Sequence, residues 1–383
     1  MSIAIVGMVL SFGATVAVVY VVYRHVKKHD VPAISIIAAS VKTAGSTTGT
    51  ALYAVVPDSQ IRDATVETFL KEIAGDKPIR FTAQQLWGFT NNYSDRIGID
   101  AGGSGVVYRG VLPNGLPVAV KRLHAGHDDG SSEERFMAEV STIGRTHHVN
   151  LVRLFGFCFD ADVRALVYEH MTEPGICPPS SPLGIGALDA YLFDCAAVVG
   201  FPTLHGIAVG VARGLRYLHE ECQQKIVHYD VKPGNGLLDV GLAPKVAGFG
   251  LAQLMNRADT HATVLGMRGT PGFGILLFEI LGRRRNFDEA APESRRWFPK
   301  LAWAKYECGE LAEVVDSRGS AEEEKGRETA RSMCEVAFWC VQQLPEARPT
   351  MGTVVKMLEG EMYIPPPPNP FQHLMAVPEV AWT

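Results

Sequence analysis

The hydrophobic pattern divides the chain into an apolar N-terminal run, a more polar connector and a long globular region. Residues 3–23 contain no charged side chain. As a helix, this run would be roughly 32 Å long, close to the thickness of a bilayer core. Arg24, Lys27 and Lys28 follow directly, and basic residues on one flank favour a cytosolic location for that flank. The pattern therefore predicts a transmembrane helix over 3–23.

A cleaved signal peptide is the alternative for this run. It would carry its positive residues before a shorter apolar core and would end at a small-residue cleavage site. Here the charges follow a long core, so a membrane helix is favoured. Little sequence precedes the helix, and we expect no extracellular domain in this chain. Residues 24–80 are predicted to be a cytosolic juxtamembrane linker.

A glycine-rich segment opens the globular region. Residues 98–110 are Gly-Ile-Asp-Ala-Gly-Gly-Ser-Gly-Val-Val-Tyr-Arg-Gly. Small residues let a backbone approach phosphate groups and offer its N–H groups to them. In a dinucleotide-binding oxidoreductase such a loop would lead into a helix. Here a hairpin turn at Pro113-Asn114-Gly115 and an apolar strand at 118–121 follow, which excludes that alternative.

The apolar strand ends in Lys121, which we expect to contact nucleotide phosphates in a cleft. A lysine there needs a carboxylate to hold it. Residues 132–147 have a helical pattern and carry Glu139 beside Phe136 and Val140. A solvated helix carboxylate is the alternative for Glu139. The order of loop, lysine and helix favours its pairing with Lys121.

The most specific motif follows a second predicted helix. Apolar residues recur at helical spacing over 204–220, and residues 226–235 are Ile-Val-His-Tyr-Asp-Val-Lys-Pro-Gly-Asn. An aspartate and an asparagine five residues apart on one loop can serve a substrate hydroxyl and a metal ion. Asp230 and Asn235 are the candidates for these roles. Lys232, between them, can neutralise a phosphoryl group in transfer.

These motifs resemble those of plant receptor-like serine/threonine protein kinases. Residues 81–92, 269–272, 281–287 and 345–360 also resemble the rust-resistance receptor kinases, and the resemblance extends over about 66–375. It implies an α+β, bilobal kinase fold, with a small antiparallel-sheet lobe and a mainly helical large lobe over 81–360. It further implies ATP and Mg²⁺ as cofactors, a protein substrate or a partner kinase, a plasma-membrane location and a link to defence signalling.

The resemblance also assigns roles to individual residues. Asp230 would be the catalytic base, Asn235 a magnesium ligand and Lys121 the ATP lysine. Tyr168 would be the gatekeeper, followed by Glu169, His170 and Met171 as the adenine-binding hinge. Lys232 and Thr270 imply serine/threonine specificity. The other expected nucleotide contacts are Gly102, Gly103, Ser104, Gly105, Val107, Ala119, Glu139 and Leu237.

Two departures from the family pattern affect the nucleotide site. The glycine loop is two residues too long: either Asp100 takes the first glycine place, or Gly98 takes it and two residues are inserted. Gly248 stands where the family has the aspartate of Asp-Phe-Gly. It leaves Asn235 as the only protein ligand of magnesium, at a cost on the order of a thousandfold in rate.

Other departures lie nearby. Tyr229 replaces the arginine that precedes the base in many kinases, which removes the usual partner of a phosphorylated activation loop. Residues 172–186 are an insertion. At 272/273 on the order of 25–30 residues of the activation segment are missing, judged by the usual motif order, so Arg348 loses its expected glutamate partner. Either this is a degenerate kinase, or the coding sequence skips an exon and retains an intron.

Composition adds limits to this picture. The net charge of −5 gives no support to nucleic-acid binding. Seven scattered cysteines without Cys-x-x-Cys spacing predict free thiols. Residues 361–383 form a Pro-rich tail with a polyproline II segment, for which an inert extension is favoured over a docking site. Together the patterns predict a membrane-anchored serine/threonine kinase of impaired activity. The alternative is a pseudokinase scaffold that binds partner kinases without catalysis.

Overall fold

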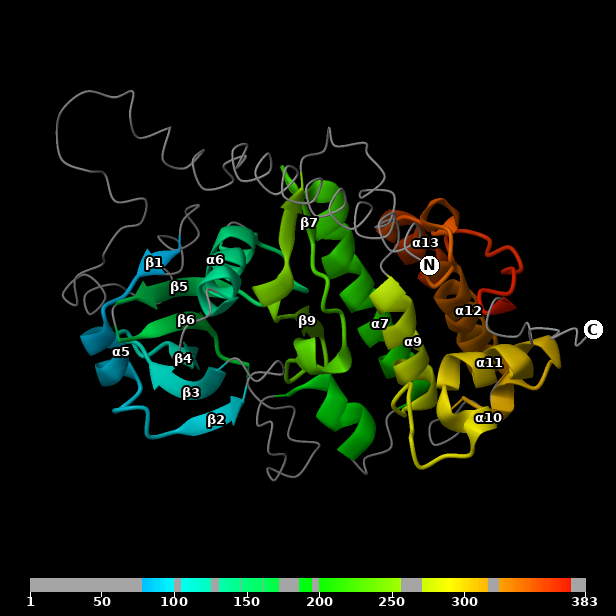
Figure 1. The fold of residues 1–383 in the computed structure, drawn as a ribbon, viewed down its shortest axis with the longest axis horizontal. Coiled ribbons are helices and arrows are strands. Elements are labelled where there is room, and N and C mark those ends of the chain that lie inside the picture. Colours follow the sequence, from blue (N-terminus) through cyan, green and yellow to red (C-terminus); the bar gives the residue numbers. More distant parts are fainter. Residues whose placement is uncertain are drawn as a thin grey trace, which may run out of the picture. The chain divides into compact units, whose positions relative to one another are not determined.

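The computed structural model describes residues 78–99, 105–124, 131–144, 146–160, 162–171, 186–194, 200–255, 271–315 and 324–372. These residues all belong to one compact unit, Tyr53–Thr383 (Figure 1). The predicted membrane helix 3–23, nearly all of the linker and the insertion up to residue 185 lie outside the described ranges. None of the helices within those ranges has the length and apolar character needed to cross a membrane.

The small lobe contains a six-stranded sheet with the order β1-β5-β6-β4-β3-β2. All neighbouring strands are antiparallel except β1 and β5, which are parallel. The sheet confirms the predicted small lobe, although β1 already lies in the range assigned to the linker. The strands are β1 (Ile79–Arg80), β2 (Arg96–Ile99), β3 (Gly105–Val111), β4 (Pro117–Leu123), β5 (Leu154–Phe159) and β6 (Arg164–Glu169).

The predicted hairpin turn joins β3 to β4. Val111 is opposite Pro117 at the end of the ladder, and Gly115 has a φ of +85°. A left-handed φ costs glycine nothing, because it has no Cβ. The side chain of Asn114 accepts a hydrogen bond from the Leu116 N–H at 3.0 Å. This local chemistry fixes the register of β4 and hence the position of Lys121.

The parallel pair β1–β5 closes one edge of the sheet. Gly156 lies opposite Ile79, and a Cβ on Gly156 would come 2.2 Å from the Ile79 carbonyl oxygen, so only glycine fits. The pairing continues as the Phe81 N–H donates to the Phe157 carbonyl at 2.8 Å. Phe81 is fully buried, and helix α5 (Ala83–Phe89) begins just after it with a capping box from Thr82.

The large lobe is mainly helical and is organised around α9 (Pro271–Gly282). Apart from Glu279, this helix is apolar around its whole circumference, which is the pattern of a buried helix. A Cβ on Gly274 would lie 2.7 Å from Val341 and 2.8 Å from Cys340, so α9 and α12 are in close contact there. The other helices are α6 (Ser131–Ile143), α7 (Phe201–Arg216), α10 (Glu293–Arg296), α11 (Phe298–Glu307), α12 (Glu324–Cys340) and α13 (Met351–Leu358).

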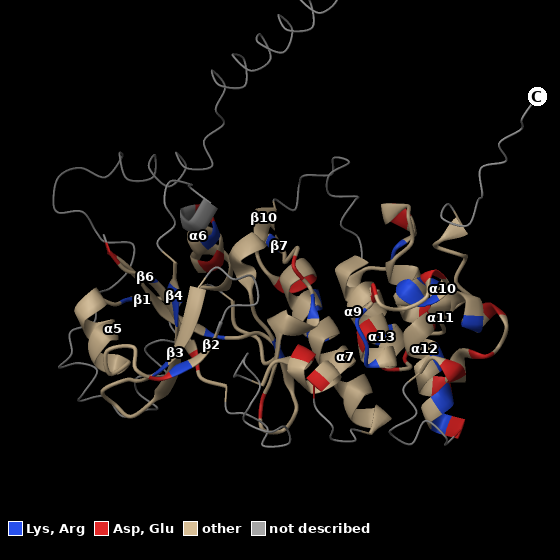
Figure 2. Ribbon diagram, turned by 60° about the horizontal axis from the view of Figure 1, so that its bottom comes forward, with Lys and Arg blue, Asp and Glu red and all other residues tan. Residues whose placement is uncertain are grey.

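Four short strands lie in the part of the chain that carries the predicted catalytic motifs. β7 pairs with β10, and β8 pairs with β9, both antiparallel. Their bounds are β7 (Lys225–Val227), β8 (Gly236–Leu238), β9 (Pro244–Val246) and β10 (Gln253–Met255). On the outer helices, Figure 2 shows acidic and basic residues interspersed along α12. The five cysteines in the described ranges are free, as predicted for them.

The Pro-rich tail is part of the large lobe as far as Phe371. The Trp339 indole N–H donates to the Pro365 carbonyl at 2.9 Å, and the Gln342 amide donates to the Pro368 carbonyl at 2.8 Å. Phe371 is only 3% exposed and packs edge-on against Trp297, with ring centroids 4.7 Å apart. Residues 361–371 are therefore held on the large lobe by hydrogen bonds to their carbonyl groups and by the buried Phe371 ring.

Candidate active site

A cavity of about 380 Å³ lies between the sheet and the large lobe. Its walls combine apolar side chains with charged groups, which is typical of sites that bind small molecules. Most of the residues predicted from the sequence meet here. Those lining the cavity are Val107, Ala119, Lys121, Glu139, Tyr168, Glu169, Met171, Lys232, Asn235 and Leu237.

The period-2 alternation of the strands explains how the sheet supplies its part of this wall. Residues directly opposite each other on paired strands point to the same face. Lys121 is opposite Val107, and Ala119 is opposite both Arg109 and Tyr168. Val118 and Val120, the alternate residues of β4, point to the other face and are fully buried in the apolar cluster beneath α5.

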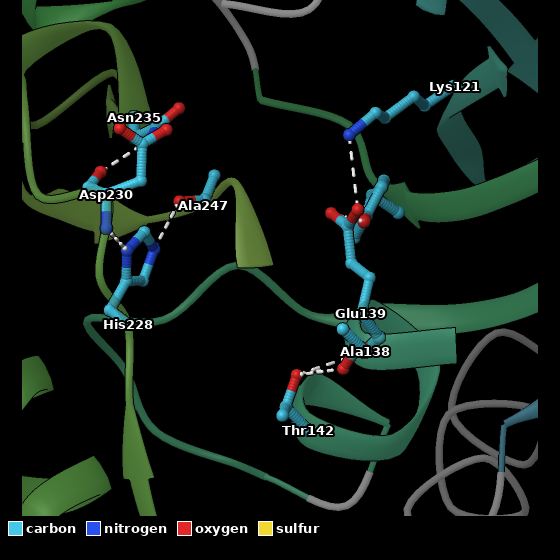
Figure 3. Close-up of polar contacts among 9 residues, drawn as sticks. Lys121, Ala138, Glu139, Thr142, His228, Asp230, Asn235 and Ala247 are labelled. Atoms are coloured by element: carbon cyan, nitrogen blue, oxygen red, sulfur yellow. Dashed lines mark hydrogen bonds and ion pairs between the residues drawn. The ribbon is translucent and has the colours of Figure 1, made fainter. Parts of the chain in front are cut away.

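Lys121 and Glu139 form a buried ion pair. The Lys121 Nζ lies 3.2 Å from the Glu139 Oε2, and the two side chains are 8% and 3% exposed (Figure 3). The Tyr168 hydroxyl donates to the other oxygen, Oε1, of Glu139. Phe136, on the same helix α6, packs edge-on against Phe157 of β5 at 5.8 Å. Packing against the sheet thus holds α6 in place. Glu139 on this helix pairs with Lys121, as the sequence predicted.

The catalytic loop lies between β7 and β8 and is cross-linked by its own side chains (Figure 3). The Asn235 amide nitrogen donates to the Asp230 carbonyl at 2.7 Å and to the Asp230 Oδ2 at 2.8 Å. The Lys232 Nζ is 2.8 Å from the same Oδ2. The three predicted catalytic residues therefore lie together, and two of them fix the orientation of the third.

His228 ties this loop to the segment that precedes Gly248. Its ring is fully buried, with the Nε2 at 2.8 Å from the Ala247 carbonyl and the Nδ1 at 3.2 Å from the Asp230 N–H. Burial is the main cause that lowers the pKa of His228. The neutral ring suits both contacts, since Nε2–H can donate while Nδ1 accepts. His228 thereby positions the backbone at Asp230.

The hinge region is braced by a second ion pair. Lys245 of β9 donates to both carboxylate oxygens of Glu169, at 2.9 and 2.8 Å. The Arg153 N–H donates to the same carboxylate at 2.8 Å. These contacts join β6, where the small lobe ends, to the large lobe.

Tyr229 in the catalytic loop has a left-handed φ of +60° and is 44% exposed.

Gly248 bears on whether a magnesium ion fits. Magnesium needs near-octahedral oxygen ligands, usually one or two carboxylates with substrate phosphates. Gly248 brings no side-chain oxygen and has a φ of +79°; a Cβ there would lie 2.5 Å from the Asn235 Oδ1. No group of three His, Cys, Asp or Glu residues that could hold a metal occurs within the described ranges. The residues present do not fit the magnesium site that the resemblance implies.

The junction at 272/273 lies at the start of α9. A Cβ on Gly272 would be 3.3 Å from the Val231 side chain, so the first turn of α9 lies directly against the catalytic loop. Within the described residues, the Arg348 side chain is bonded to backbone carbonyl groups. The Arg348 guanidinium donates to the Gln342 and Gln343 carbonyls at 2.6 and 3.0 Å. The Ala291-Pro292-Glu293 triplet leads into α10, where Glu293 is exposed.

Several cavity residues were not predicted. Glu279 of α9 lines the wall together with Asp189, Phe193 and Arg285. Burial raises the pKa of Glu279, while the Asn286 N–H donates to it at 3.2 Å. A glutamate within an otherwise apolar helix is a sequence signal that could have identified Glu279 as a site residue. Its neighbours in the cavity depend on tertiary packing.

Part of the predicted glycine loop cannot be placed. Gly102, Gly103 and Ser104 lie outside the described residues, as does Thr270 of the substrate loop. Gly98 is in β2, opposite Val107. Gly105 begins β3, and a Cβ there would lie 2.6 Å from the Arg122 carbonyl oxygen. The backbone of Gly105 is therefore packed closely against β4.

Comparison with known proteins agrees with this geometry. Residues 93–274 match the protein kinase domain family. A G-type lectin S-receptor-like serine/threonine-protein kinase of Arabidopsis thaliana is 39% identical over 313 residues, which are 76% of this chain and 36% of that protein. Rust resistance kinase Lr10 of Triticum aestivum is 37% identical over 330 residues, which are 80% of this chain and 49% of that protein.

The chain thus spans well under two thirds of the length of these curated relatives. The matched region includes strands β2 to β6 of the sheet, the Lys121–Glu139 pair and the catalytic loop. The family predicted from the sequence motifs is confirmed. By its catalytic domain, this chain belongs to the plant receptor-like serine/threonine protein kinases, in the group that includes the rust-resistance kinases.

Proposed function

We propose that this protein binds ATP in the cleft between its lobes and transfers a phosphoryl group to serine or threonine hydroxyls of a protein substrate, at a reduced rate. The observation that carries the proposal is the meeting of Asp230, Lys232 and Lys121 at one cleft. Asp230 and Lys232 line a second cavity of about 210 Å³, which shares Lys121, Glu139 and Asn235 with the larger one. Phosphoryl transfer depends mostly on such positioning and on charge.

The side chains divide the work as follows. Val107, Ala119 and Leu237 supply apolar surface for a flat base, and Lys121 faces the phosphates. Asp230 accepts the proton of the substrate hydroxyl. Lys232, at 2.8 Å from the Asp230 Oδ2, supplies positive charge beside the transferred group. The reduced rate follows from Gly248, which offers no oxygen to a cation and so leaves the charge on the phosphates to be balanced by the lysines alone.

Replacement of Asp230 by asparagine tests this proposal. The change keeps the size of the side chain and removes its basicity, so we expect phosphate incorporation to fall by about 100-fold. The measurement uses the full chain, labelled ATP and a generic protein substrate. The matched control is Asp162→Asn, at an exposed aspartate between β5 and β6, which should leave the rate unchanged. Equal rates for the wild type and Asp230→Asn would refute the proposal.

We further propose that residues 3–23 anchor the protein in the plasma membrane with the kinase domain in the cytosol. The uncharged run, its basic flank and the receptor-like name of the Arabidopsis relative support this placement. In plant cells, the full chain should sediment with membranes and resist extraction by alkaline carbonate. Deletion of residues 3–23 should release it. Recovery of the full chain in the carbonate supernatant would contradict the anchor.

A further inference from the structure

The strongest unexplained feature of the cleft is the position of the Asn235 side chain. A Cβ on Gly248 would lie 2.5 Å from its Oδ1, 2.6 Å from its Cγ and 2.8 Å from its Nδ2. These distances are shorter than real Cβ contacts. The whole Asn235 amide therefore lies across the space in which a side chain of residue 248 would begin.

The Asn235 amide is also fixed in this position. Its nitrogen donates to the carbonyl and to the carboxylate of Asp230, and its backbone carbonyl accepts from the Ala247 N–H at 2.8 Å. Asn235 is 6% exposed. The amide nitrogen is thus bound to Asp230, and the amide oxygen, the atom that a cation would bind, is the atom nearest to the Cβ position of residue 248. A hydrogen bond to a charged group, such as the one to the Asp230 carboxylate, contributes about 1.5–3 kcal/mol.

Positive charge is available in the cleft without a metal. Lys121 and Lys232 both line the two adjoining cavities, together with Gly248. An ammonium group has three N–H donors, so a lysine that is paired with a carboxylate can also donate to a phosphate oxygen. Lysine is a common phosphate ligand as a point charge. The two lysines come from opposite lobes, β4 and the catalytic loop, and both face the shared space.

We propose that this cleft binds the phosphates of its nucleotide without a divalent cation, with Lys121 and Lys232 supplying the positive charge. The inference rests on the proposed function, because it takes the cleft as the nucleotide site. This inference goes further than the loss of the aspartate ligand at position 248. Gly248 supplies no oxygen, and the Asn235 amide lies where a side chain of residue 248 would begin, so the two lysines carry the phosphate charge and nucleotide affinity becomes independent of magnesium.

The test is a calorimetric titration of the full chain, purified in detergent, with ATP. One sample contains excess magnesium chloride and the other contains EDTA. We expect the two dissociation constants to agree within about twofold. Binding that is about tenfold or more tighter with magnesium would overturn the inference and leave the proposed nucleotide site intact. An absence of binding in both samples would overturn both the inference and the proposed function.

A lysine variant tests the source of the positive charge. Lys232→Gln should weaken ATP binding by about 10- to 100-fold, and by the same factor in EDTA and in magnesium. The matched control is Lys300→Gln on α11, where the lysine is exposed, and it should leave both constants unchanged. A loss confined to the magnesium sample would contradict the assignment, because the lysine would then act together with a bound cation.

Discussion

Replacement of Lys121 by alanine is expected to lower the free energy of unfolding by about 3–5 kcal/mol, because it leaves a buried carboxylate without its cation. The Glu139 side chain is 3% exposed, and its contacts in the cleft are the Lys121 ammonium and the Tyr168 hydroxyl. Alanine would remove the charge partner and retain the neutral one. The same variant should lose ATP binding. Urea unfolding and ATP titration of the full chain measure the two effects.

A double variant separates these effects. Lys121→Met with Glu139→Gln keeps an acceptor for the Tyr168 hydroxyl but removes both buried charges. Replacing a buried ion pair by uncharged groups of similar size is often close to neutral for stability. We therefore expect the double variant to recover most of the unfolding free energy while ATP binding stays lost. If Lys121→Ala were as stable as the wild type, the structural role assigned to this pair would be wrong.

Replacement of Phe371 by alanine is expected to lower the free energy of unfolding by about 3–5 kcal/mol, as for other buried phenylalanines. Its ring is packed against Trp297 and lies 6.3 Å from the Phe338 ring, measured between centroids. Truncation would leave a cavity between the tail and α12. It would also weaken the hydrogen bonds that the Pro365 and Pro368 carbonyls accept from Trp339 and Gln342. Urea unfolding of the full chain gives the value.

Tyr363→Ala is the matched control for the tail. It removes an aromatic ring from the same segment, but this ring is 78% exposed. Surface substitutions of this kind usually change stability by less than about 0.5 kcal/mol. If the two variants behaved alike, Phe371 would contribute no more than an exposed residue, and the tail would not be part of the core.

Local patterns were sufficient for the parts of the fold that depend on periodicity and turn chemistry. The Asn114-Gly115 turn set the β3–β4 hairpin, and alternation along β4 placed Lys121 on one face and Val120 on the other. The predicted helix over 132–147 is shorter in the structure, since α6 ends at Ile143. Helix ends depend on capping and tertiary contacts that periodicity does not contain.

The candidate site could be predicted only as a set of residue types. The sequence showed that Gly248 lacks an oxygen, but it did not show that the Asn235 amide lies in the space of the missing side chain. That placement depends on the distance between two loops. The bond from Tyr168 to Glu139 and the backbone partners of Arg348 likewise join segments that are separate in sequence. The packing of the tail on the large lobe was not predicted, because a proline run does not show which surface it will contact.

The parallel strand β1 has a mechanical consequence. Any chain that precedes Pro78 enters the domain through Ile79 and Arg80, which lie along β5 with Phe81 buried directly behind them. Tension from the N-terminal side would act along this strand, so that its hydrogen bonds to β5 would be loaded together in shear. Gly156 permits the close approach that this pairing needs. The edge strand can therefore act as a tether that keeps a pull on the N-terminal side from reaching the cleft directly.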